Sequence, residues 1–311
     1  MKVVITARNF NIEGCRAKEM LEDNGFEVVD YSAVIYNNEA DYLEAVKDAD
    51  AIINAVEPMS EATLKECRKL RLISERGIGI DHLDEAACKR HNIDISRTVG
   101  AVEAAVAEMA MAYILYFARR IDLQNDIMQS GKWERIMMSG ARNMTLGIIG
   151  FGGIGRELAK RAEAFDMKVL YYCRTPKKDT SATFAELDEL VKKSDYIVLC
   201  IPLTEETRGF FGKELISKMK SSAVLINVAR GAVADNEAIR EAIINRKIAG
   251  AAIDVFEFEP CTDSILKGFD NVVLTPHTSP YTKDNFITMN EFAAKNVIDY
   301  FSGSINPKNL V

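Results

Sequence analysis

The 311-residue sequence has few of the side chains on which metal, disulfide or nucleic-acid chemistry usually depends. It contains three histidines and six cysteines, and no two cysteines have the spacing Cys-x-x-Cys. We therefore expect free thiols in a reducing compartment, with neither disulfides nor a metal site. The net charge of −7 argues against nucleic acid or an anionic membrane as a partner.

Long apolar runs and targeting signals are also missing. The most apolar stretch, 104–118, contains Glu108 and is short for a bilayer span, so we expect a buried helix there. Met1-Lys2 leads directly into Val3-Val4-Ile5, without the apolar core of a secretion signal. These absences predict a cytoplasmic protein that does not bind membranes.

What the chain does have is two series of short apolar runs separated by segments of helical periodicity. The expected strands are 3–5, 26–29, 51–54, 72–74 and 93–96, then 145–149, 169–172, 196–201, 224–228, 250–255 and 272–274. Between them, segments such as 60–70 and 184–191 place apolar residues on one helix face. This alternation predicts an α/β fold with two doubly wound parallel sheets.

A glycine-rich loop opens the second series. Gly150-Phe151-Gly152-Gly153-Ile154-Gly155 follows an expected strand and precedes an expected helix, the context in which G-x-G-x-x-G binds a dinucleotide pyrophosphate. Its late position predicts that a Rossmann nucleotide domain, 99–280, is inserted into a flavodoxin-like substrate domain, 1–98 and 281–311. We expect a last helix at 284–301, and ligands in a cleft near the carboxyl ends of both sheets.

Three expected strand ends in the second series carry chemically active side chains. Arg230 follows 224–228, Glu257 and Glu259 follow 250–255, and His277 follows 272–274. Such residues often form only surface salt bridges. They can also converge as a proton donor, its carboxylate partner and a clamp for an anionic substrate. Of the other two histidines, His82 is expected at a helix start and His91 at a solvated helix end.

Together these motifs resemble the D-specific 2-hydroxyacid dehydrogenases, which include glyoxylate and hydroxypyruvate reductases, D-lactate dehydrogenases and phosphoglycerate dehydrogenases. The resemblance covers nearly the whole chain. The segments that carry it are 76–81, 106–108, 150–155, 201–204 with Thr207, Asn227-x-x-Arg230-Gly231, 254–260 and Thr275-Pro276-His277.

The resemblance implies roles for the strand-end residues. Arg230 would bind the substrate carboxylate and polarise its carbonyl, and His277 would protonate the carbonyl oxygen as hydride arrives. Glu259 would hydrogen-bond His277; we prefer it to Glu257 because it directly precedes Pro260. The backbone N–H groups of Ile78 and Gly79 would bind the substrate carboxylate.

The resemblance also implies a cofactor site. Asp254 would anchor the nicotinamide carboxamide, and the N–H groups of Gly153 and Ile154 would bind the pyrophosphate. The other cofactor-binding residues expected are Gly150, Gly152, Gly155, Cys173, Arg174, Thr175, Pro202, Thr207 and Val228.

The end of the second nucleotide-domain strand bears on the choice of cofactor. An NAD site usually has Asp or Glu there to bind the ribose 2′-hydroxyl. This chain has Cys173 followed by Arg174, which favours the 2′-phosphate of NADP. In the alternative, Arg174 stacks on adenine and NAD remains usable.

The substrate is less well defined by the sequence. Glu57 disfavours a phosphorylated acid, and Glu259 argues against a formate dehydrogenase, in which glutamine occupies this position. We expect a small 2-keto acid such as glyoxylate or hydroxypyruvate, with D-lactate-type and phosphoglycerate-type dehydrogenases as alternatives. A nicotinamide-sensing corepressor of the same fold is the alternative from another class. The segment 103–119 is apolar on more than one face, which is typical of a helix buried within one domain or, alternatively, of a subunit interface. The resemblance implies a homodimer formed through the nucleotide domain, and we expect one here.

Overall fold

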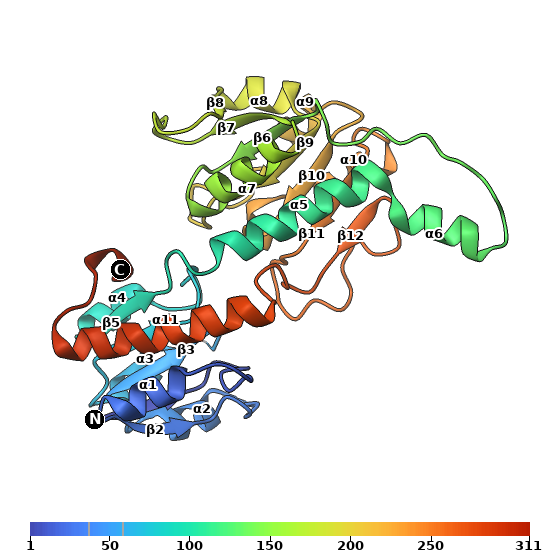
Figure 1. The fold of residues 1–311 in the computed structure, drawn as a ribbon. Helices are drawn as coiled ribbons and strands as arrows, with labels where there is room; N and C mark the ends of the chain where they lie inside the picture. Colours follow the sequence, from blue (N-terminus) through green and yellow to red (C-terminus); the bar gives the residue numbers. More distant parts are fainter. Residues whose placement is uncertain (37, 58) are drawn as a thin grey trace. The chain divides into compact units, whose positions relative to one another are not determined.

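The structure is a computed structural model that describes residues 1–36, 38–57 and 59–311. It divides into two compact units, Met1–Val102 with Tyr281–Val311, and Glu103–Pro280 (Figure 1). The sequence put the first boundary four residues earlier, at 98/99. It falls at Glu103 because the long helix that begins there packs within the second unit, against the helix that follows the glycine loop.

The first unit is built on a five-stranded parallel sheet with the order β2-β1-β3-β4-β5. Its strands are β1 (Lys2–Ile5), β2 (Glu27–Asp30), β3 (Ala51–Asn54), β4 (Leu72–Glu75) and β5 (Asp94–Arg97). Its helices are α1 (Ala17–Asp23), α2 (Glu39–Val46), α3 (Glu61–Glu66), α4 (Glu85–Arg90), α11 (Lys283–Ser302) and the 3₁₀ turn η2 (Pro307–Asn309). This strand order is the flavodoxin-like order that the sequence predicted.

Both faces of this sheet are covered, which explains why its strands are apolar runs. Val3 and Ile5 of β1 pack with α1 and with Ala293 and Val297 of α11. Val4, on the opposite face, belongs to a second core with residues of α2, α3 and α4. The C-terminal helix α11 therefore completes the core of the N-terminal domain.

The second unit contains a seven-stranded parallel sheet with the order β12-β11-β10-β9-β6-β7-β8. Its strands are β6 (Thr145–Ile149), β7 (Lys168–Tyr172), β8 (Thr183–Phe184), β9 (Tyr196–Leu199), β10 (Val224–Asn227), β11 (Gly250–Ile253) and β12 (Val272–Leu274). Its helices are α5 (Glu103–Arg119), α6 (Ile121–Gln129), α7 (Gly153–Ala164), α8 (Leu187–Lys193), α9 (Lys213–Lys218), α10 (Asn236–Ile244) and the 3₁₀ turn η1 (Gly231–Val233). The order reverses between β6 and β9, as in a Rossmann fold, so the predicted fold class is confirmed.

Three local predictions were wrong. Phe184 was expected in a helix but lies in the short strand β8, where it pairs with β7 and its ring meets Tyr171 edge-on. The helix expected at 60–70 ends at Glu66, because a turn closed by Leu70 N–H to Cys67 C=O leads the chain into β4. Helix α6 was not predicted; it is amphipathic, but none of its side chains is buried.

All six cysteines are free thiols in this structure. Among the described residues, we find no helix with the length and apolar character needed to span a membrane.

Candidate active site

The site residues of the second unit follow three neighbouring strands. Strands β10, β11 and β12 are adjacent and parallel, so their carboxyl ends lie at one edge of the sheet. Arg230, Glu259 and His277 stand in the loops that leave this edge. Ligands of open α/β sheets bind at such edges, so the topology brings together the loops that the sequence singled out.

The imidazole of His277 is held by a carboxylate. Its Nδ1 lies 2.7 Å from Glu259 Oε2, and the two side chains are 36% and 35% exposed. Glu259 Oε1 accepts a hydrogen bond from Phe256 N–H at 2.9 Å. Burial opposes ionisation, but the hydrogen bonds from His277 and Phe256, with the nearby charge of Arg230, keep the pKa of Glu259 below its usual value. The arrangement fixes the ring while leaving it open to solvent.

The backbone at His277 is held by Asp254, a buried residue directly after β11. Asp254 accepts hydrogen bonds from the Thr275 hydroxyl at 2.5 Å, Thr278 N–H at 2.9 Å and Ser279 N–H at 3.0 Å. His277 itself has a φ of +52° and donates its N–H to the Asp254 carbonyl at 2.7 Å. This left-handed conformation is unfavourable for histidine, and the surrounding bonds maintain it. In this structure Asp254 therefore positions the loop that carries His277; its contact with the nicotinamide stays a prediction.

Arg230 lies in a loop that is tied to the same edge. The buried Asn227 donates to the Arg230 carbonyl at 2.9 Å and accepts from Ala229 N–H at 3.0 Å. Next to Arg230, a Cβ on Gly231 would collide with the backbone of Phe256. The Arg230 loop and the loop that carries Glu259 thus approach so closely that only glycine fits at position 231.

The glycine loop between β6 and α7 has the geometry of a pyrophosphate cradle. Gly150 has a φ of +100°, and a Cβ on Gly155 would collide with the Gly150 carbonyl. A Cβ on Gly152 would meet nothing within 4 Å, so the backbone there faces open space at the N-terminus of a 12-residue helix. The N–H groups of the first helical turn suit an anionic pyrophosphate. The residues present fit a dinucleotide cofactor.

The remaining predicted cofactor residues lie in loops of this unit. Cys173 follows β7 and donates to Thr175 C=O at 3.1 Å, while Arg174 is exposed. Pro202 follows β9, and the Thr207 hydroxyl donates to its carbonyl at 2.7 Å. Val228, directly after β10, is buried.

Ile78 and Gly79 belong to the first unit, where they lie in the loop that follows β4. The loop is fixed at Gly77, whose carbonyl accepts bonds from the N–H of Thr98 at 2.9 Å and from its hydroxyl at 3.2 Å.

Two contacts of these side chains were not predicted. Glu257, which was ranked below Glu259 as the partner of His277, forms an exposed ion pair with Arg208 at 3.4 Å. In the first unit, His82 lies 3.2 Å from the buried Glu75 and before α4, not at a helix start. The sequence contains a signal for the contact between Glu75 and His82. Glu75 ends an apolar strand run, where a buried neutral residue is the usual choice, so a carboxylate at this position indicates a polar partner.

This geometry defines a dinucleotide-binding α/β protein with a carboxylate–imidazole pair and an arginine at one sheet edge, and comparison with known proteins identifies the class. The family model for the D-isomer specific 2-hydroxyacid dehydrogenase, NAD binding domain, matches residues 111–279. The chain therefore belongs to the D-isomer specific 2-hydroxyacid dehydrogenases.

Individual relatives resemble most of the chain. It is 38% identical to a glyoxylate reductase of Thermococcus litoralis over 283 residues, which covers 86% of this chain and 85% of the relative. It is 39% identical over 239 residues to a hydroxypyruvate reductase of Thermotoga maritima, with coverage of 75% and 78%. The solved structure of a D-lactate dehydrogenase from Aquifex aeolicus, complexed with NAD and lactic acid, matches with a TM-score of 0.86 and 30% identity, covering 100% of this chain and 99% of that one.

Proposed function

We propose that the protein reduces a small 2-keto acid, of the glyoxylate or hydroxypyruvate type, to the D-2-hydroxy acid at the expense of a reduced nicotinamide dinucleotide. The observation that carries the proposal is the 2.7 Å bond between His277 and Glu259 in loops that leave the carboxyl edge of a Rossmann sheet. The glyoxylate and hydroxypyruvate reductases among its relatives support the substrate class.

In this proposal the chain's own residues manage the charge and the proton. When bound, the cofactor supplies the hydride to the keto carbon. His277 donates a proton from Nε2 to the carbonyl oxygen, because Nδ1 is engaged by Glu259. Glu259 stabilises the imidazolium before transfer, and Arg230 binds the carboxylate and polarises the carbonyl. The N–H groups of Ile78 and Gly79 are assigned to the substrate carboxylate.

The cofactor is held by the glycine loop, and the proposal favours NADP over NAD. The residue after β7 is Cys173, not a carboxylate that would repel a 2′-phosphate, and the exposed Arg174 is available to pair with it. Arg174→Ala should lower kcat/KM with NADPH by at least about tenfold, while kcat/KM with NADH changes less than about threefold. Equal losses with both cofactors would contradict the preference.

The homodimer and the cytoplasmic location are proposed with this function. Support for the dimer comes from the nucleotide domain, where α6 and the segment after it extend away from their sheet (Figure 1). Trp133 is 76% exposed and Met137 is 95% exposed in that segment. Large apolar side chains exposed together often mark a subunit interface. Light scattering of the purified protein should give twice the chain mass, and a monomeric mass would overturn the dimer.

The function is tested by mixing the protein with NADPH or NADH and a panel of glyoxylate, hydroxypyruvate, pyruvate and 3-phosphohydroxypyruvate. Steady loss of the reduced-nicotinamide absorbance with the small acids supports the proposal. Preference for pyruvate or for the phosphorylated acid would indicate the D-lactate or phosphoglycerate type. Tight cofactor binding without turnover of any acid would indicate a sensor, and would refute the reductase assignment.

A further inference from the structure

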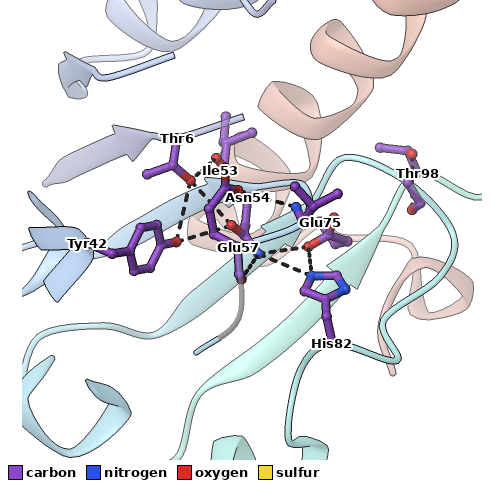
Figure 2. Close-up of polar contacts among 10 residues, drawn as sticks. Thr6, Tyr42, Ile53, Asn54, Glu57, Glu75, His82 and Thr98 are labelled. Atoms are coloured by element: carbon purple, nitrogen blue, oxygen red, sulfur yellow. Dashed lines mark hydrogen bonds and ion pairs between the residues drawn. The ribbon is translucent and has the colours of Figure 1, made fainter. Parts of the chain in front are cut away.

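A second polar cluster lies at the carboxyl edge of the first unit's sheet, outside the His277 site. Thr6 follows β1, Asn54 ends β3, Glu75 ends β4 and Thr98 follows β5, and all four are buried. Figure 2 shows their side chains with those of Tyr42 and His82, and marks the hydrogen bonds that join all of them except Thr98, which bonds to Gly77. Buried polar groups at this edge of a parallel sheet stand where such folds bind their ligands.

The hydrogen bonds fix Asn54 in one orientation. Its Oδ1 accepts from the hydroxyls of Tyr42 at 3.1 Å and Thr6 at 3.4 Å. Its Nδ2 donates to the Glu57 carbonyl at 3.1 Å and to Glu75 Oε2 at 3.2 Å. The hydroxyls of Tyr42 and Thr6 hold the oxygen of the amide, so its nitrogen points toward Glu75 (Figure 2).

Only one oxygen of the Glu75 carboxyl is used by this network. Oε2 meets Asn54 and lies 3.2 Å from His82 Nε2. Oε1 is buried and has no hydrogen-bond partner among the residues that the structure describes. An unmet polar atom in a residue that is only 1% exposed is costly, and it calls for a partner that the chain itself does not supply.

We propose that Glu75 is a specificity-determining residue whose free oxygen, Oε1, binds a hydroxyl group on C3 of the substrate. This inference rests on the proposed function, because it places the substituent beside the loop of Gly77, Ile78 and Gly79 to which the substrate carboxylate is assigned. Glu75 is two residues before Gly77 on the same strand end, and Thr98 anchors that glycine.

A hydroxyl suits this oxygen better than the other substituents of small keto acids. Glyoxylate has no C3, and the methyl group of pyruvate cannot form the bond. A hydroxyl both donates and accepts, so it satisfies Oε1 whether the carboxyl is ionised or protonated. That matters here because burial raises the pKa of Glu75, against the opposing effects of His82, Arg76 and Asn54. The preferred substrate is therefore a 3-hydroxy-2-keto acid.

The test compares hydroxypyruvate with pyruvate, which differ only in that hydroxyl. The wild-type protein should have a kcat/KM at least about 100-fold higher for hydroxypyruvate, because a site built to bind a hydroxyl rejects the analogue that lacks it. Glu75→Leu should reduce this ratio by about 10- to 100-fold, mainly through hydroxypyruvate. Glu75→Gln, which keeps an oxygen and a donor in place, should retain a ratio within about fivefold of wild type.

Two controls separate recognition from loss of structure. Tyr42→Phe removes one of the two hydroxyls that bind Asn54 Oδ1; because the Thr6 hydroxyl still binds that oxygen, the ratio should be unchanged. Glu66→Gln removes an exposed carboxylate on α3 of the same unit and should do the same. If Glu75→Leu fails to fold, the ratios of wild type, Glu75→Gln and Tyr42→Phe decide.

Several outcomes overturn the inference. A wild-type ratio near one means that water alone satisfies Oε1. If Glu75→Leu lowers kcat/KM equally for both acids, the cluster only supports the loop. The same conclusion follows if Tyr42→Phe changes the ratio as much as Glu75→Leu does. Absence of turnover with every keto acid in the wild type defeats the proposed function itself, and is distinct from turnover without preference.

Discussion

Replacing Glu259 by glutamine tests the central element of the site. The amide would keep the size of the side chain but could not offer His277 a negative charge. A hydrogen bond to a charged group contributes about 1.5 to 3 kcal/mol. Because both side chains are about a third exposed, water weakens the interaction, and we take the lower figure, about 1.5 kcal/mol. That corresponds to roughly a tenfold change in rate if the interaction acts in the transition state.

Reduction needs a proton on His277, and Glu259→Gln removes the negative charge that stabilises it there. Glu259 carries that charge above a pKa that lies below its usual value. We therefore expect a roughly tenfold loss of kcat/KM for keto-acid reduction near neutral pH, where the wild-type carboxylate is ionised. The two profiles should approach each other as the pH falls.

The assay is the rate of reduced-nicotinamide oxidation across pH, at limiting keto acid. Glu257→Gln is the matched control: its carboxylate, in the same loop, pairs with Arg208 in solvent, and the profile should not move. If Glu259→Gln has the wild-type profile, or if Glu257→Gln shows the tenfold loss instead, the assignment of Glu259 is wrong.

Three further substitutions probe the scaffold. Gly231→Ala should lower the free energy of unfolding by about 1 to 3 kcal/mol in chemical denaturation, because the new methyl group meets the Phe256 backbone; an unchanged midpoint would contradict the close packing. Gly152→Ala should leave that free energy within about 0.5 kcal/mol, since the added Cβ faces open space, yet weaken dinucleotide binding measured by fluorescence titration. Asp254→Asn should cost about 1 to 3 kcal/mol and lower kcat more than it changes KM, because the loop that carries His277 loses its charged acceptor.

The sequence predicted the fold well because both sheets are buried on two faces. A strand such as 51–54, apolar almost throughout, can hardly be placed elsewhere, and its predicted bounds match β3. Prediction failed at β8 and at α6. Strand β8 has only two residues, too few to show an alternation of apolar and polar side chains. Helix α6 is amphipathic but buries none of its side chains, and it was not singled out from the sequence.

For the candidate site, sequence motifs located the residues but not their bonds. Nothing in the order of Glu257 and Glu259 decides by itself which carboxylate meets His277. That choice depends on the path of the loop between β11 and β12, where Phe256 N–H binds one oxygen of Glu259 and the other oxygen meets His277. The same holds for Glu75 and His82, whose meeting depends on how the chain folds back after Ile80.

The buried Glu75 should make stability depend on pH in a sense opposite to that of most carboxylates. Burial raises its pKa above the unfolded value of 4.5, so stability is fully present below that value and is lost as the pH rises toward the folded pKa. The hydrogen bond and charge of His82 oppose the shift, so His82→Gln should raise the pKa further and extend the decline to higher pH. Glu75→Gln has no proton to lose and should not show it. Thermal melts of the three proteins between about pH 5 and about pH 8 measure the difference. A decline in Glu75→Gln as steep as in the wild type would show that the carboxyl does not cause it.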